Sequence, residues 1–213
     1  MLDALDASGR LSGVHAVLTG YLPTIEHVRF AAEAASRVSS KNSAAQVYCD
    51  PVFGDDPGGL YLKEAVAKAI RDELLPLADM AFPNRFELGW LSGQPVSDIG
   101  SAIGAANDLR IHSVLATSIP GTPGDLVNLW VSDGEAIICP VRRMEQVPHG
   151  TGDLLTALFI GHRLNGGLGT DHFSRAVAGV AAALTFSQGH NELQLAIQPE
   201  AWANPKPFSV HKL

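Results

Sequence analysis

The most informative stretch of the sequence is Val147-Pro-His-Gly-Thr-Gly-Asp153, which runs directly into the helix-forming residues 154–164. Its glycines let the backbone turn tightly and bring its amides close to a ligand. The helix that follows offers unpaired N–H groups and the positive end of its dipole. Together these features predict a site that binds a phosphate or an oxyanion. The stretch is neither a Walker loop nor a dinucleotide-binding fingerprint, because it lacks their lysine and glycine spacing.

Asp153 stands at the start of this helix, within reach of whatever the anion site holds. A carboxylate in that place can take a proton from an attacking hydroxyl. The alternative is that Asp153 only caps the helix, because Asp is a common N-cap residue. Gly121-Thr-Pro-Gly-Asp125 has almost the same letters, but Pro123 lacks an N–H and residues 126–131 continue as a strand. We predict a plain loop there, with no helix dipole behind it.

Short apolar runs alternate with longer amphipathic ones along the rest of the chain. Strands are predicted at 15–18, 46–49, 80–82 and 113–117, with a hairpin of 126–131 and 136–139 around Ser132-Asp133-Gly134. Helices are predicted at 24–39, 63–75, 86–91, 96–109, 153–164 and 173–188, with a loop at 50–59. This order predicts the α/β class: a mainly parallel sheet with helices on both faces. Ligands in such folds bind beyond the carboxyl ends of the strands, which places the loops after Leu18, Cys49, Phe82 and Thr117 on one rim.

Composition sets limits on the function. The 213 residues carry 15 Lys and Arg against 22 Asp and Glu, a net charge of −7, and 46% are hydrophobic. This predicts one ordered domain over residues 1–213 and excludes a basic surface for nucleic acid. The two cysteines are expected to be free thiols, and no ligand spacing suggests zinc. The start is not a signal peptide, and the longest apolar run, 176–186, is too short to span a membrane, so we expect a cytoplasmic protein.

Five segments carry a family resemblance. The His149-Gly-Thr-Gly-Asp153 loop resembles the anion hole of the ribokinase-like kinases. The other four appear in the order that bacterial-type pyridoxal kinases show: Thr19-Gly-Tyr-Leu22, Asp50-Pro-Val-Phe-Gly54, Phe82-Pro-Asn-Arg-Phe-Glu87 with Leu91-Ser-Gly93, and Val114-Leu-Ala-Thr-Ser118. The set spans Val14 to Leu164. The resemblance implies a three-layer α/β/α ribokinase-like fold. It also implies a phosphotransferase that uses ATP to phosphorylate the 5′-hydroxymethyl group of pyridoxal, as in vitamin B6 salvage.

The resemblance also implies roles for the residues of the anion loop. Asp153 would be the catalytic base that activates the hydroxyl group of the substrate. The amides of Gly150, Thr151 and Gly152 would stabilise charge on the transferred γ-phosphoryl group, as phosphoryl transfer requires. The expected partners are therefore a small B6 vitamer and ATP, without nucleic acid or membrane.

Further roles fall on the strand-end loops. Asp50 would face the phosphates and cations, and Thr117 would touch the nucleotide phosphates. Asn84 and Glu87 match the N-x-x-E segment that organises Mg²⁺ through water; Mg²⁺ itself takes one or two carboxylates plus phosphates. The remaining assignments are that Tyr21 and Tyr61 flank the phosphate or the substrate.

Each of these residues also has a plainer interpretation. Asp50 before a proline can start a turn, and Asn84 can cap a helix. Glu87 can be a solvated first-turn residue that the helix dipole favours, and Tyr61 can be a core aromatic.

Two other functions stay open. Hydroxymethylpyrimidine kinase shares the His-Gly-Thr-Gly loop and the Asp-Pro-Val segment, although that branch often carries Cys after the loop where this chain has Asp153. A nucleotide-binding fragment without turnover is the second alternative, because the family's opening strands have no counterpart before Val14, so the domain is expected to be incomplete at its N-terminus. The resemblance further implies a homodimer and a monovalent cation such as K⁺.

Overall fold

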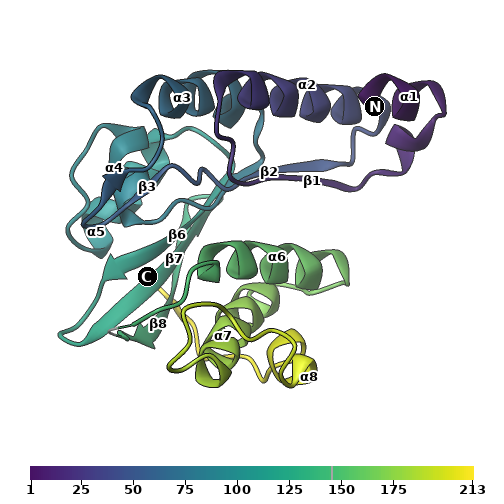
Figure 1. Ribbon diagram of the computed structural model, residues 1–213. Coiled ribbons are helices and arrows are strands. Elements are labelled where there is room, and N and C mark those ends of the chain that lie inside the picture. The colour runs from purple at the N-terminus through teal and green to yellow at the C-terminus, as the bar shows by residue number, and fades with distance from the viewer. Residues whose placement is uncertain (145) are drawn as a thin grey trace.

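A single mixed sheet organises the molecule in the computed structural model, which describes residues 1–144 and 146–213 (Figure 1). Within these residues the sheet has the order β1-β2-β5-β6-β7-β8-β9. β1, β2, β5 and β6 pair in parallel, whereas β7, β8 and β9 are added antiparallel. The strands are β1 (Ala16–Thr19), β2 (Gln46–Cys49), β5 (Met80–Ala81), β6 (Ser113–Pro120), β7 (Asp125–Ser132), β8 (Glu135–Arg142) and β9 (His211–Lys212).

Helices cover both faces of this sheet. In Figure 1, α2 and α3 lie above the strands, while α6 and α7 lie below them. The helices are α1 (Leu2–Ala7), α2 (Ile25–Lys41), α3 (Glu64–Ala69), α4 (Arg85–Ser92), α5 (Ile99–Asp108), α6 (Thr151–Leu164), α7 (Asp171–Phe186) and α8 (Pro199–Ala203). A small separate hairpin is formed by β3 (Gly54–Asp55) and β4 (Gly59–Leu60). The predicted three-layer α/β/α fold is confirmed.

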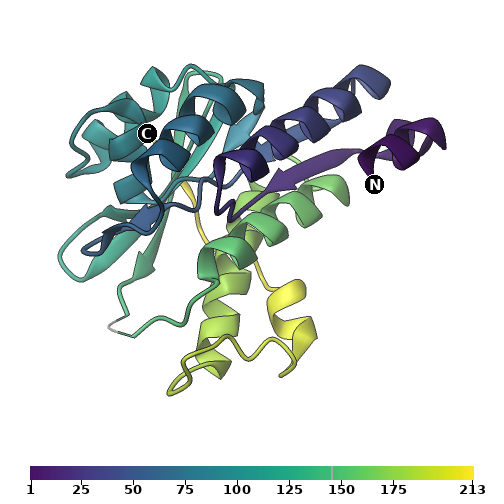
Figure 2. The same ribbon diagram turned by 45° about the horizontal axis from the view of Figure 1, so that its top comes forward.

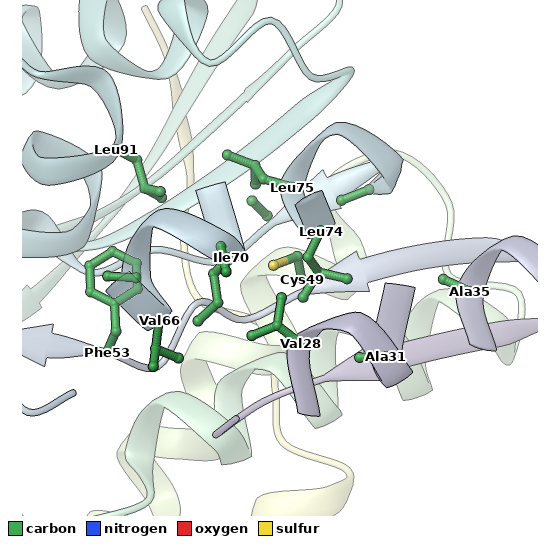
Figure 3. Packing of buried hydrophobic residues seen from close by; sticks show 14 of the residues in the cluster. Val28, Ala31, Ala35, Cys49, Phe53, Val66, Ile70, Leu74, Leu75 and Leu91 are labelled. Carbon is green, nitrogen blue, oxygen red and sulfur yellow. The ribbon is translucent and has the colours of Figure 1, made fainter. Parts of the chain in front are cut away.

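The central strands are apolar because both of their faces are buried. Along β2, Val47 and Cys49 pack with α2 and α3, whereas Tyr48 between them packs with α6 and α7. Figure 3 shows the first of these clusters, in which Cys49, Val28 and Ile70 approach one another from a strand and two helical segments. Alternate side chains therefore hold opposite helical layers to one sheet.

Most predicted elements are confirmed within two or three residues. Both cysteines are buried and free, and the hairpin of β7 and β8 turns at Asp133 and Gly134 as predicted. The predicted helix 63–75 is instead the short α3 followed by a π-helical turn, Ile70–Leu74, and a 3-10 turn, Leu75–Leu77. The predicted loop 50–59 contains β3 and part of β4, and β6 runs three residues beyond the predicted Thr117.

The described part of the chain has no helix of the length and apolar character that crossing a membrane requires.

Candidate active site

A cavity of about 930 Å³ opens at the carboxyl ends of the parallel strands. The loops after β1, β2, β5 and β6 meet there because these strands run the same way. Figure 2 shows that α6 starts at the same end of the sheet to which β1 runs. Every predicted site residue lines this cavity: Tyr21, Asp50, Tyr61, Asn84, Glu87, Thr117, Gly150, Thr151, Gly152 and Asp153.

The anion loop ends in an uncapped helix. Gly150 is the N-cap residue of α6, and its φ of +91° lies in the left-handed region that favours glycine. No side chain accepts a hydrogen bond at this helix end. The first N–H groups of α6 are therefore free to bind an anion, and they lie at the wall of the cavity.

Asp153 is in the first turn of α6 and does not cap it, so the plainer interpretation of this residue is wrong. Its side chain is exposed and lines the cavity. A Cβ atom placed on Gly20, just after β1, would lie 3.9 Å from Asp153 Oδ1. Gly20 and Asp153 thus lie side by side in the cavity, where the exposed carboxylate can accept the proton of a bound hydroxyl.

Asp50 follows β2 and is only 6% exposed. The Thr156 hydroxyl donates a hydrogen bond to Asp50 Oδ2 over 3.0 Å. Burial raises the pKa of the Asp50 carboxyl to about 7; the Thr156 hydrogen bond opposes this shift, and the charge of Asp153 adds to it. Asp50 is thus a desolvated carboxylate at the cavity wall whose charged form a bound cation would stabilise.

Asn84 and Glu87 cap α4 and tie it to the loop after β2. The Glu87 N–H donates to Asn84 Oδ1 (3.0 Å), and the Asn84 N–H donates to Glu87 Oε2 (2.9 Å), which together form a capping box. Glu87 Oε1 also accepts from the N–H groups of Phe53 (3.0 Å) and Gly54 (3.4 Å). Asn84 Nδ2 donates to the Gly54 carbonyl (2.7 Å).

Glu87 is only 3% exposed, so its interpretation as a solvated first-turn residue is wrong. Burial raises the pKa of its carboxyl to about 8, against the hydrogen bonds donated by the Asn84 and Phe53 N–H groups. Both carboxyl oxygens already accept backbone N–H groups, so the main structural role of this side chain is to hold the loop after β2 in place. Its predicted part in organising Mg²⁺ stays a prediction. Within residues 1–144 and 146–213, no group of three or more His, Cys, Asp or Glu is arranged to hold a metal ion.

Two tyrosines border the cavity. Tyr21 is 59% exposed and Tyr61 is 53% exposed, so Tyr61 is not a core aromatic. Tyr21 follows β1, and Tyr61 follows the β3–β4 hairpin, where its N–H donates to the Phe53 carbonyl (2.8 Å). Both side chains are thus available to a ligand, and their predicted contacts stay predictions.

Thr117 and Ser118 lie at an irregularity of β6. The pairing of β6 with β7 shifts register between Ala116 and Ile119, and Ser118 has a φ of +61°. The Thr117 N–H donates to the Pro83 carbonyl (3.0 Å), which connects β6 to the residue before Asn84. Ser118 lines the cavity together with Thr117, so the irregularity of β6 lies at the site.

A second, more apolar cavity of about 660 Å³ adjoins the first. Thr117, Ser118, Thr151 and Gly152 are among the residues that line both cavities, so the anion loop lies between them. No sequence motif indicates the residues that line only the second cavity: Asn128, Pro140, Val141, Arg142, Val177, Val180, Ala181, Leu184, Phe208, Ser209 and His211. The site as a whole can hold a flat apolar group on one side of an anion-binding loop and a polar molecule on the other.

The first cavity is lined by more acidic than basic side chains. Its described cations are Arg85 and Arg143, and Arg85 forms an ion pair with Asp56 (2.7 Å). Asp50, Glu87 and Asp153 have no such partner among the described ion pairs. A cation beside a bound polyphosphate would find carboxyl groups without an ion-pair partner there, and it would favour the ionised forms of Asp50 and Glu87.

Comparison with known proteins agrees with this geometry. The family model described as phosphomethylpyrimidine kinase matches residues 3–195. Pyridoxal kinase PdxY of Leifsonia xyli is 32% identical over 212 residues, which cover 95% of this chain and 75% of that protein. A pyridoxine/pyridoxal/pyridoxamine kinase of Bordetella pertussis is 34% identical over 203 residues, which cover 92% of this chain and 72% of that protein.

Among solved structures, pyridoxal kinase from Leishmania donovani in complex with ADP and pyridoxamine has a TM-score of 0.90 at 29% identity. The match covers 100% of this chain and 79% of that chain. These likenesses extend over the fold, the strand-end loops and the anion loop together. The chain therefore belongs to the phosphomethylpyrimidine kinase family, in which its relatives include pyridoxal kinases.

Proposed function

We propose that the chain phosphorylates the 5′-hydroxymethyl group of pyridoxal with ATP as the phosphoryl donor, which yields pyridoxal 5′-phosphate and ADP. The observation that carries the proposal is the uncapped start of α6, which opens onto a cavity with Asp153 in its first turn. Relatives named pyridoxal kinase and a neighbour that binds ADP and pyridoxamine support this choice of substrates.

The reaction follows from the placement of these groups. Asp153 takes the proton of the substrate hydroxyl as the hydroxyl oxygen forms a bond to the γ-phosphorus. The bond from the γ-phosphorus to the bridging oxygen breaks, ADP leaves, and Asp153 returns the proton to solvent. The amides of Gly150, Thr151 and Gly152 stabilise the negative charge of the phosphoryl group in transfer.

The two cavities divide the substrates. The apolar cavity between β7, β8 and α7 suits the adenine ring, and the polar cavity suits the phosphates and pyridoxal. Thr117 and Ser118, which line both cavities, lie where a triphosphate would pass. Tyr21 and Tyr61 have exposed rings that can cover the pyridine ring.

Mg²⁺ is the cofactor that this chemistry calls for, because it neutralises phosphate charge during transfer. Asp50 fits it best: it is a carboxylate at the cavity wall whose desolvation a cation relieves. Glu87 and Asn84 would not contact the ion directly; their hydrogen bonds would hold the loop after β2, which carries Asp50, in place. A monovalent cation, a cytoplasmic location and a homodimer are expectations from the family resemblance. Sedimentation equilibrium of the chain tests the homodimer.

One alternative acceptor has support of its own, because the matching family model is described as phosphomethylpyrimidine kinase. The test is therefore to measure ADP release from Mg-ATP in the presence of pyridoxal, and to add hydroxymethylpyrimidine as a competing substrate. Release that depends on pyridoxal and prevails in competition supports the proposal. Preference for the pyrimidine would assign the chain the pyrimidine kinase activity, with the same mechanism. If neither substrate causes ADP release, turnover by this chain is contradicted.

A further inference from the structure

Thr156 lies one helical turn after Asp153 and is only 1% exposed. Its hydroxyl is 3.0 Å from Asp50 Oδ2 and 3.1 Å from the carbonyl oxygen of Gly152. The second contact is the ordinary bond of a helical threonine to the residue four positions earlier. The first contact reaches a strand end 106 positions away in the chain.

This hydroxyl connects the two halves of the site. Asp50 belongs to the loop after β2, and Gly152 belongs to the anion loop. In the described part of the chain, the Thr156 hydroxyl makes the only hydrogen bond between α6 and residues 50–53. Both loops must act on the same triphosphate, so their separation has to be fixed closely.

We infer that Thr156 is a positioning residue, which holds the Asp50 carboxylate in register with the amides of the anion loop. The inference rests on the proposed function, because it supposes that Asp50 and these amides contact one Mg-nucleotide. Valine has nearly the volume of threonine but no hydroxyl, so a valine at position 156 removes both contacts of the hydroxyl with little change in the packed volume. Any helical threonine can bond a carbonyl four positions earlier, so the link to Asp50 is the contact of this hydroxyl that bears on the site.

Thr156→Val keeps the shape of the side chain and removes the hydroxyl, and Thr156→Ser keeps the hydroxyl. We expect Thr156→Val to raise KM for Mg-ATP by about tenfold or more and to change KM for pyridoxal by less than about twofold, because misplacement of one group affects only the ligand that it contacts. Thr156→Ser should lie within about threefold of the unmodified chain. Thr185→Val is the matched control, since the Thr185 hydroxyl bonds only the Ala181 carbonyl four positions earlier (3.0 Å) on α7.

A binding measurement separates positioning from general loss of structure. Calorimetric titration with ADP should show about tenfold weaker binding to Thr156→Val in the presence of Mg²⁺ and little change in EDTA. In an Asp50→Ala background the same substitution should have no further effect, because the partner is gone. If Thr156→Val does not fold, Thr156→Ala makes the same comparison with a smaller side chain.

The outcomes distinguish this inference from the proposed function. If the unmodified chain binds no ADP, the proposed function is contradicted, and the inference falls with it. If the unmodified chain binds ADP and Thr156→Val binds it equally well with Mg²⁺, the proposed function stands and the positioning role is wrong. Equal weakening with Mg²⁺ and with EDTA, or weakening that persists beside Asp50→Ala, also contradicts the positioning role.

Discussion

Two loops of this chain have almost the same sequence and opposite structures. Gly121-Thr-Pro-Gly-Asp125 connects β6 to β7, and its groups bond one another: the Gly121 N–H donates to the Asp125 carbonyl, and the Thr122 hydroxyl donates to Asp125 Oδ2 (2.9 Å). The loop at 150–153 instead leads into α6 and leaves its N–H groups and the Asp153 carboxylate to the cavity. Both loops contain a glycine in the left-handed region, Gly124 at φ +92° and Gly150 at φ +91°.

The element that follows such a loop therefore determines its chemistry. In a strand, the backbone N–H and C=O groups are hydrogen-bonded to a neighbouring strand. A helix leaves its first N–H groups unpaired and places the positive end of its dipole there. The two aspartates, the two glycines and the two threonines are therefore natural pairs of test and control.

The largest effect is expected at the aspartates. Asp153→Asn should lower kcat by about 100-fold or more, because the amide cannot take the hydroxyl proton, while ADP binding persists. Asp125→Asn should leave kcat within about twofold. Steady-state ADP release measures both, and an Asp153→Asn variant as active as its parent would remove Asp153 from the role of base.

The glycines should differ in activity but not in stability. Alanine in the left-handed region costs roughly 1–2 kcal/mol of folding free energy, and both sites have room for a Cβ atom, with nearest atoms at 3.7 Å for Gly150 and 3.8 Å for Gly124. Denaturant unfolding should therefore show similar losses in Gly150→Ala and Gly124→Ala. Only Gly150→Ala should lose about tenfold or more in kcat/KM, because it turns the amides of α6. Equal kinetic losses in both variants would contradict the comparison.

Asp50 gives the stability of the protein a pH dependence. Its pKa is about 7 in the folded chain, well above the ordinary aspartate value of 3.8, so it binds its proton more tightly when the chain is folded. It therefore stabilises the fold below about pH 4, and this contribution is lost as the pH rises towards 7. In the ligand-free protein, the Tm of Asp50→Asn should exceed that of its parent by about 4 °C or more at pH 8, and the difference should shrink towards pH 4.

Burial also lowers the pKa of His172, to about 4, which destabilises the fold as the pH falls. This effect is present in both proteins and cancels in the difference between them. A Tm difference for Asp50→Asn that is constant from pH 4 to pH 8 would contradict the assigned burial of the Asp50 charge.

The smallest effect is expected at the threonines. Thr151→Ala should leave kcat within about threefold, because the amide of residue 151 and not its side chain faces the anion. Thr122→Ala removes the hydrogen bond to Asp125 and should cost about 1 kcal/mol of stability with no kinetic effect. A large kinetic loss in Thr151→Ala would show that the anion site depends on side chains as well as backbone.

The sequence predicted the features that depend on local pattern. Buried strands such as β2 are short apolar runs, and their shared direction brings Asp50, Asn84 and Thr117 to one rim. The contrast between the two glycine loops was also predictable, because Pro123 and the strand after it are visible in the letters. These inferences need only the periodicity of hydrophobic residues along the sequence and the direction of the strands.

The remainder depends on contacts between distant segments. The three N–H groups on Glu87 come partly from a loop 33 and 34 positions earlier, so its burial has no local signature. The π-helical turn at 70–74 and the bulge at Ser118 reflect packing and pairing with other elements. The wall of the apolar cavity needs Phe208 and His211 beside β8, which no periodicity indicates.

The central claim is that the start of α6 directs the γ-phosphoryl group of ATP to a hydroxyl of pyridoxal. The most direct test incubates the chain with Mg-ATP and pyridoxal and quantifies ADP, inorganic phosphate and phosphorylated pyridoxal by mass spectrometry. We predict one pyridoxal 5′-phosphate for each ADP, with little free phosphate. ADP accompanied by inorganic phosphate, or the absence of a phosphorylated vitamer, would contradict the account.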